Sequence, residues 1–213
     1  MNAPTTAATT APPTAASPTL REVFGLDSRL PELADTTLVM IDFQNTYTTG
    51  VMELDGVREA LAAGARLLAA ARAAGVPVVH VVNDGGENSP YDIGAEIGAV
   101  CDEVAPVDGE PVVVKQFPDA FHDTDLEKVL RELGAGTELV LAGFMTHMCI
   151  VFTAHGAITR GYRPTVVAEA TATRPLAGPD GTVVSAAALQ AASLVTVSDR
   201  FGAVAATVDE FIG

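Results

Sequence analysis

Short apolar runs rich in β-branched residues alternate along this chain with Ala-rich stretches of helical length. Six of these runs predict strands, at residues 38–42, 76–82, 111–115, 139–142, 164–168 and 194–197. Most are apolar without alternation, a pattern typical of strands that are buried on both faces of a parallel sheet. The pattern therefore predicts a parallel sheet with helices on both faces, an α/β/α three-layer sandwich.

Three stretches between these runs have the spacing of helices. In residues 57–74, Val57, Leu61, Ala65 and Leu68 recur at steps of three or four residues, and the Gly-Val-Pro sequence at 75–77 ends the pattern. Residues 125–133 and 148–160 are each followed by a glycine, the residue that most often terminates a helix. The spacing thus predicts crossover helices at all three places.

Composition and length fit one globular domain preceded by a tail. The chain has 213 residues, of which 48% are apolar and 18% charged, so a single core can organise it. Residues 1–20 are almost wholly Ala, Thr and Pro without charge, and bury too little apolar surface to offset their ordering entropy. We expect a disordered tail at 1–20, or alternatively an arm that orders on a neighbouring subunit, and one domain over 21–213.

The charge balance excludes some partners. With 12 Lys and Arg against 27 Asp and Glu, the net charge of −15 repels nucleic acid and anionic membrane surfaces. No apolar run approaches the roughly 18 residues of a membrane span. The two cysteines are far too few for a disulfide scaffold, which favours a reducing compartment. We expect a soluble, cytoplasmic protein that acts on a small molecule.

Three reactive residues fall at the predicted carboxyl ends of strands, where ligands of open parallel sheets bind. Asp42 ends the first strand, Lys115 ends the third, and Cys149 begins the helix after the fourth. A helix N-terminus and a lysine both favour a thiolate, and a carboxylate can accept its proton. Taken singly, Cys149 could be a core filler, Asp42 a cap and Lys115 a solvated residue; together they predict a nucleophilic site.

Other catalytic classes lack their motifs. The chain has no Gly-rich phosphate loop after a strand and no Gly-x-Ser-x-Gly elbow, which argues against a nucleotide-binding protein and a serine hydrolase of the α/β type. Its four histidines are dispersed without the spacing of a zinc helix. The sequence therefore predicts no metal and no cofactor.

The same residues carry a family resemblance. The segments Leu38-Val-Met-Ile-Asp42-Phe-Gln44-Asn45, Val112-Val-Val-Lys115 with Ala120-Phe121, and Ala142-Gly-Phe-Met-Thr146-His-Met-Cys149-Ile150 resemble the isochorismatase-like cysteine hydrolases, which include nicotinamidases and N-carbamoyl-amide hydrolases. The resemblance runs from about residue 38 to 211. It implies a six-stranded parallel sheet of order 3-2-1-4-5-6, and we expect a homo-oligomer.

The resemblance also implies roles for individual residues. Asp42 would deprotonate Cys149, whose thiolate attacks an amide carbonyl, and Lys115 would hold both groups in place. A cis peptide bond at Phe144–Met145 would align the backbone N–H groups of Met145 and Cys149 as an oxyanion hole.

The substrate pocket departs from the nicotinamidase pattern. That branch binds a metal through Asp-x-His and a later His, whereas this chain has Asn-Asp-Gly-Gly-Glu at 83–87. Where many relatives have Asp, His147 predicts a differently shaped pocket, with a solvent-facing ring as the alternative. By position, Tyr47 and Phe121 are expected pocket walls, with core packing as the competing interpretation. We also place Gln44 at the pocket, where it orients the loop of Asp42 more than it touches substrate.

The leading hypothesis is an amidase that cleaves a small amide, lactam or carbamoyl compound, with a streptothricin-type lactam as one candidate. One alternative is a vinyl-ether hydrolase of the isochorismatase type, in which the aspartate acts as an acid and no nucleophile is needed. Another is a catalytically idle family member that serves as a binding or assembly protein. An acyl adduct on Cys149 would distinguish the first from the other two.

Overall fold

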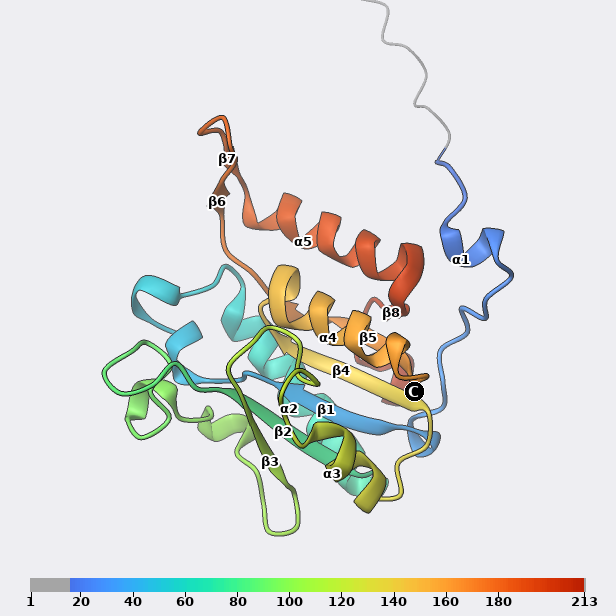
Figure 1. Ribbon diagram of the computed structural model, residues 1–213, viewed down its shortest axis with the longest axis horizontal. Coiled ribbons are helices and arrows are strands. Elements are labelled where there is room, and N and C mark those ends of the chain that lie inside the picture. Colours follow the sequence, from blue (N-terminus) through green and yellow to red (C-terminus); the bar gives the residue numbers. More distant parts are fainter. Residues whose placement is uncertain (1–15, 213) are drawn as a thin grey trace, which may run out of the picture.

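A six-stranded parallel sheet forms the centre of the computed structural model, which describes residues 16–212 (Figure 1). Its order is β3-β2-β1-β4-β5-β8, and every neighbouring pair is parallel. The strands are β1 (Thr37–Ile41), β2 (Val78–Asn83), β3 (Val112–Lys115), β4 (Glu138–Phe144), β5 (Arg163–Ala172) and β8 (Ala203–Ala205). The predicted parallel sheet and its strand order are confirmed, β8 being the sixth strand.

Helices cover both faces of this sheet. Helix α2 (Val57–Ala73) packs on one face, and α3 (Leu126–Glu132) and α4 (Val151–Thr159) pack on the other, beside α5 (Ala186–Thr196). Figure 1 shows α4 and α5 in front of the strands and α2 behind them. Alternate residues of β1 point to the two faces, so that Leu38 and Met40 pack against α2 while Val39 and Ile41 lie on the side of α3 and α4.

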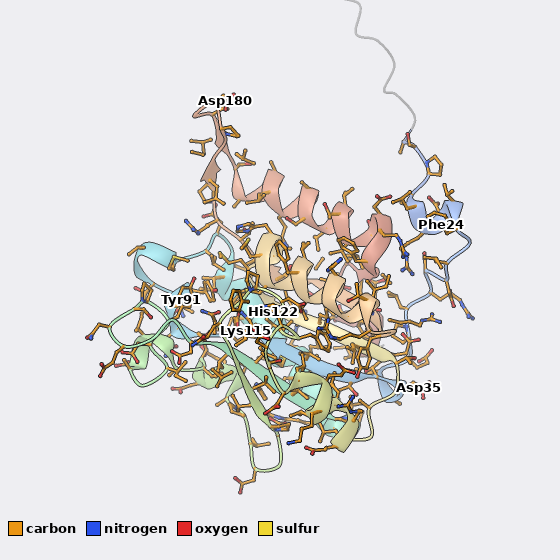
Figure 2. The ribbon with its side chains drawn as sticks, in the orientation of Figure 1. Phe24, Asp35, Tyr91, Lys115, His122 and Asp180 are labelled. Atoms are coloured by element: carbon orange, nitrogen blue, oxygen red, sulfur yellow. The ribbon has the colours of Figure 1, made fainter. Side chains whose placement is uncertain are left out.

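Short elements connect this framework. A hairpin of β6 (Leu176–Ala177) and β7 (Val183–Val184) projects from the end of α5, with Asp180 at its tip (Figure 2). The remaining turns of helix are α1 (Leu20–Val23), α6 (Asp209–Ile212), five 3₁₀ turns η1 (Leu33–Asp35), η2 (Asn45–Tyr47), η3 (Gly50–Met52), η4 (Glu96–Gly98) and η5 (Asp102–Val104), and two π-helical turns η6 (Thr146–Ile150) and η7 (Val197–Phe201). No helix within residues 16–212 is long and apolar enough to cross a membrane.

The three predicted helices form with small shifts of their ends. Helix α2 ends just before Gly75, whose φ of +68° is the left-handed conformation that glycine supplies at a helix terminus. Gly134 and Gly161 take the same conformation after α3 and α4. Helix α4 begins at Val151 rather than at residue 148, because a π-helical turn precedes it.

The predicted strand at residues 194–197 is wrong. Ser185 caps α5 by accepting the Ala188 N–H, and the helix runs through residue 196 into η7. Ser193 and Val197, four residues apart, face the interior, whereas Val195 between them is 64% exposed. A helix buries residues four positions apart while it exposes the residue midway between them, whereas a strand would bury all three. The β-branched run at residues 194–197 therefore continues the Ala-rich helix that precedes it. The sixth strand is the three-residue β8 instead.

The boundary of the predicted tail also changes. Residues 1–15 lie outside the described part of the chain. Thr19 caps α1, with its hydroxyl accepting the Glu22 N–H, and the Leu20 N–H donates to Asp199 at 2.8 Å. Residues 19 and 20 therefore pack with the domain.

Strands β1 and β4 approach very closely where they end. Gly143 has a φ of +130°, and a Cβ built on it would lie 1.8 Å from the Ile41 carbonyl oxygen. The ladder between β4 and β5 also shifts register between Leu141 and Gly143. Only glycine fits this position, and the close approach brings the segments that follow β1 and β4 together.

Candidate active site

Three buried side chains meet at the carboxyl ends of β1, β3 and β4. The Lys115 ammonium lies 2.7 Å from Asp42 Oδ2 and donates to Cys149 Sγ at 3.3 Å. Asp42 and Lys115 are at most 1% exposed, and Cys149 is 7% exposed. The structure thus brings together the three residues that the sequence singled out, which are 73 and 34 positions apart (115 − 42 and 149 − 115). Lys115 is labelled in Figure 2, inside the molecule.

The backbone of Asp42 adopts an uncommon conformation. Its φ of +53° lies in the left-handed region, which costs a non-glycine residue energy and often marks a functional position. Its N–H still donates to the Val81 carbonyl at 2.8 Å, and its own carbonyl accepts the Gln44 N–H at 2.8 Å. The turn after β1 is therefore fixed on both sides of Asp42.

Asn83 is a site residue that the sequence analysis missed. It ends β2, between the ends of β1 and β3, and its Oδ1 accepts a hydrogen bond from Lys115 Nζ at 3.2 Å. The Lys115 ammonium therefore faces Asp42, Cys149 and Asn83. The position of Asn83 at the end of a predicted strand was the feature of the sequence that could have identified it.

Gln44 is fully buried and bound to backbone on every side. Its Nε2 donates to the carbonyls of Asn83 and Gly98, at 3.0 and 2.7 Å, and its Oε1 accepts the Asn83 N–H at 2.9 Å. With its amide engaged in this way, Gln44 positions Asn83 and the turn after Asp42. This placement agrees with the orienting role expected for it.

Cys149 is held by the segment after β4. The Phe144–Met145 peptide bond is cis, at the position that the resemblance implies. The Thr146 hydroxyl donates to the Ala172 carbonyl at 3.0 Å and ties η6 to the end of β5. Cys149 lies in η6, two residues before α4 begins.

Burial dominates the electrostatics of the three groups. It raises the pKa of the Cys149 thiol, and the neighbouring Asp42 carboxylate raises that pKa further, against the opposing effect of Lys115. Lys115 lowers the thiol pKa as expected, but burial and Asp42 outweigh it, so the thiol is the resting form. Burial also raises the pKa of Asp42, although Lys115 opposes it, so this carboxylate is a stronger base than an exposed one. Burial lowers the pKa of Lys115, but Asp42 and Cys149 outweigh it and the net pKa is raised.

The two expected pocket aromatics lie in different cores. Tyr47 is 1% exposed and packs edge-on against Tyr91 and Phe144, in the core beneath α2. Burial and then the charges of Asp42 and Cys149 raise its pKa strongly. Phe121 stacks on Tyr162 beneath the Arg160 guanidinium, in the core under α3 and α4. Its position agrees with the core-packing alternative.

A second polar group lies near Cys149. The His147 ring contacts the Thr173 hydroxyl through Nδ1 at 2.6 Å, and the residue is half-buried. Burial and then the positive charge of Arg174 lower the pKa of His147 and keep it neutral. Burial raises the pKa of Tyr91, and Cys149 and Asp42 raise it further. Tyr91 packs edge-on against Tyr47, and Arg174 directly follows Thr173, the partner of His147.

Arg174 has no partner for its guanidinium in the described structure. Its Nε is buried without a hydrogen bond, and within residues 16–212 it forms no ion pair. The residue is only partly buried, so the rest of its guanidinium is open to receive an anion. Sequence reasoning missed Arg174 because its position depends on the long β5 strand.

The histidines of the described part of the chain do not cluster with other metal-binding side chains. Residues 16–212 contain no group of three or more His, Cys, Asp or Glu side chains that could hold a metal ion. His80, on β2, is buried and contacts Glu110 Oε2 at 2.9 Å, and Glu110 also binds Arg72. This cluster joins β2, α2 and the start of β3, as expected for a packed, hydrogen-bonded histidine.

The chain is similar to known proteins over most of its length. Residues 36–209 match the family model described as the isochorismatase domain. A solved isochorismatase from Pseudomonas putida KT2440 superposes with a TM-score of 0.87 at 36% identity, covering 92% of this chain and 100% of its own.

Several characterised or named proteins are similar to this chain in sequence. The secreted isochorismatase effector Isc1 of Verticillium dahliae is 32% identical over 190 residues, which are 89% of this chain and 97% of the relative. A maleamate amidohydrolase of Pseudomonas putida is 40% identical over 149 residues, 62% of this chain and 70% of the relative. A streptothricin hydrolase of Streptomyces noursei is 35% identical over 139 residues, 64% of this chain and 54% of the relative.

Proposed function

The chain belongs to the isochorismatase domain family, whose members include hydrolases that act on amides, and from this we propose that it hydrolyses a small amide through a thioester on Cys149. The observation that carries the proposal is the Lys115 ammonium, which contacts both Asp42 and Cys149 inside the protein. A nucleophile, a base and a fixed cation are the groups that an acyl transfer needs.

The reaction proceeds in two halves. Asp42 accepts the Cys149 proton while Sγ bonds to the amide carbon, and Asp42 then passes that proton to the leaving nitrogen as the C–N bond breaks. In the second half Asp42 takes a proton from water, whose oxygen attacks the thioester, and the proton returns to Cys149 as the acid departs. The raised pKa of Asp42 suits it to accept and donate the same proton.

Two further features support the transition state. The backbone N–H groups of Met145 and Cys149 flank the place where the carbonyl oxygen develops its negative charge. Such donors typically contribute about 10²–10³ in turnover. Lys115 keeps its positive charge throughout, since its raised pKa lies far above neutrality, and it stabilises the thiolate as that charge forms.

The substrate class follows from Arg174. We infer that the amide carries a carboxylate, because a planar guanidinium without a partner, directly after the Thr173 that binds His147 of the Cys149 segment, matches a carboxylate in shape and charge. The name of the maleamate amidohydrolase relative supports this class, since maleamate is a monoamide with a free carboxylate. A cationic streptothricin-type lactam would face the same positive charge, and we rank it below the anionic amides.

Trapping the intermediate tests the covalent route. Rapid acid quench with a slowly hydrolysed amide should give a protein heavier by one acyl group, and peptide mapping should locate it on Cys149. Cys149→Ser should give no stable thioester, and Cys101→Ser should give the wild-type mass increase. Turnover without an adduct, at an unchanged rate in Cys149→Ser, would favour the vinyl-ether mechanism. Absence of any turnover across a panel of amides and vinyl ethers would favour a binding protein.

A matched pair of substrates tests the role of Arg174. Maleamate and its neutral diamide differ only in whether the second group is a carboxylate or a carboxamide. Arg174→Gln should lower kcat/KM for maleamate by about 10- to 100-fold, the loss of one charge-assisted contact, and should change the value for the diamide by less than about threefold. Equal losses for both substrates would contradict recognition of the carboxylate.

A further inference from the structure

A cleft lined by several charged residues lies at the opposite end of the sheet from Cys149. It has a volume of about 320 Å³ and opens between the segment after α1 and the amino ends of β4, β5 and β8. Its apolar walls include Leu26, Ile158 and Phe201. Strand β4 connects the two ends of the molecule, because Glu138 lines the cleft and Phe144 precedes the Cys149 segment. At about 3.3 Å per residue, the 7-residue strand separates the two sites by roughly 20 Å.

Positive charge is concentrated in this cleft. Arg21, Arg29, Arg163 and Arg200 line it, four of the 12 Lys and Arg residues in a chain whose net charge is −15. Only two carboxylates line it, those of Asp27 and Glu138, so the cleft has a surplus of two positive charges (4 − 2). A cationic cleft on so acidic a protein is the opposite of what its composition predicts.

The two carboxylates are already occupied. Arg29 binds Asp27 at 2.8 Å, and Arg163 binds Glu138 at 2.9 Å. Within residues 16–212, Arg21 and Arg200 form no ion pair, and the Arg200 guanidinium lies 6.0 Å from the Phe24 ring centre. The surplus positive charge of the cleft therefore lies on Arg21 and Arg200.

Arg21 is the more unusual of the two. It is only 9% exposed, its Nε is buried without a hydrogen bond, and its one hydrogen bond goes to the Asp27 carbonyl. Arg163 and Arg200 line the same cleft, and burial and then their charges lower the pKa of Arg21. Burying like charges together is costly unless an anion lies between them.

We propose that this cleft binds a small organic anion, a phosphate or carboxylate group on an apolar body, between Arg21 and Arg200. The anionic group would accept hydrogen bonds from the two guanidinium groups, and the apolar body would lie against Leu26 and Phe201. Figure 2 shows Phe24, which Arg200 contacts, on the side of the molecule away from Lys115. The anion site is therefore separate from the site of amide hydrolysis and does not depend on it.

Calorimetric titration of the full chain tests the proposal with phenyl phosphate and benzoate as probes. Both supply an anion on an aromatic body, and the difference between them tells whether phosphate or carboxylate is preferred. We expect saturable binding of at least one probe, no binding of the neutral analogue phenol, and affinity that falls as KCl is raised.

Four variants locate the binding. Arg21→Gln and Arg200→Gln should each weaken the affinity at least about tenfold, the loss of one charge-assisted contact. If Arg21→Gln disturbs the fold of the N-terminal segment, Arg200→Gln still tests the site, because it leaves Arg21 in place. Arg66→Gln, on an exposed arginine paired with Glu169 away from the cleft, should stay within twofold of wild type, whereas a loss of affinity in Arg174→Gln would assign the binding to the Cys149 site instead. Absence of saturable binding, or a loss in Arg174→Gln without a loss in Arg200→Gln, would overturn the proposal.

Discussion

Replacement of Lys115 by Met removes the only cation that contacts the buried Asp42 carboxylate within residues 16–212. Both side chains are fully buried, so water cannot replace the lost ammonium. Breaking a buried pair from one side typically costs about 3–5 kcal/mol, because the remaining charge is left without compensation. We expect Lys115→Met to lower the free energy of unfolding by that amount at pH 8, and to lower turnover at least about a hundredfold.

The cost should depend on pH in a defined direction. Without the ammonium, burial alone acts on Asp42, and its pKa rises further above that of the unfolded chain. Between those two pKa values the unfolded chain releases the proton while the folded protein keeps it. The stability of the variant therefore falls by about 1.4 kcal/mol per pH unit as the pH rises, from near pH 4 up to the raised pKa of the folded protein.

Urea unfolding of four proteins between pH 4.5 and 8.5 measures this effect. The proteins are wild type, Lys115→Met, Asp42→Asn and the double variant, whose buried pair is neutral on both sides. The double variant should be more stable than Lys115→Met at pH 8, and its loss of turnover should be far smaller than the product of the single losses, because the residues act as a unit. A penalty in Lys115→Met that is independent of pH, or a double variant less stable than both single variants, would refute the reasoning.

Three further outcomes are expected. Cys149→Ala should fold and lose hydrolysis while Cys101→Ala keeps most of it, and iodoacetamide should label Cys149 first because it is 7% exposed against 1% for Cys101; preferential labelling of Cys101 would contradict this order. Hydrolysis should survive exhaustive dialysis against a chelator, and restoration of a lost activity by added zinc would show that the loop after β2 binds metal after all. Hydrogen bonds from Arg72 lower the pKa of Glu110 from 4.5 to about 2, so this group stabilises the fold above pH 4.5 and loses about 3 kcal/mol as the pH falls towards 2. Glu110→Gln should remove that part of the acid sensitivity in urea unfolding, and an unchanged acid profile would count against it.

Local pattern predicted most of the sheet because five of its strands are continuous apolar runs bounded by polar or turn residues. It failed at residues 194–197, where β-branched side chains continue a helix that Ser185 had already started. It also missed β8, since three residues of Ala and Val carry too little signal to be distinguished from a loop. In both cases tertiary packing, which buries Val197 and both alanines of β8, decides the structure.

The reactive residues were predictable because strand ends converge whatever the loops do. Asp42, Lys115 and Cys149 could be placed together by topology alone. The partners of these residues could not, because Gln44 reaches Asn83 and Gly98 through the conformation of two loops. The raised pKa of Cys149 was equally hidden, since it depends on how completely the site is buried. Sequence thus indicated which groups come together, and the structure was needed to show how deeply they are buried.

The contact between Gly143 and the Ile41 carbonyl limits how this chain can vary. Any side chain at position 143 would push β1 away from β4, and would separate Asp42 from Cys149 without touching either. On the proposed function, specificity can change at positions such as His147 or Arg174, which lie outside this contact. The spacing of the reacting groups depends instead on a main-chain contact that tolerates no substitution, so new substrates can be acquired while the chemistry stays the same.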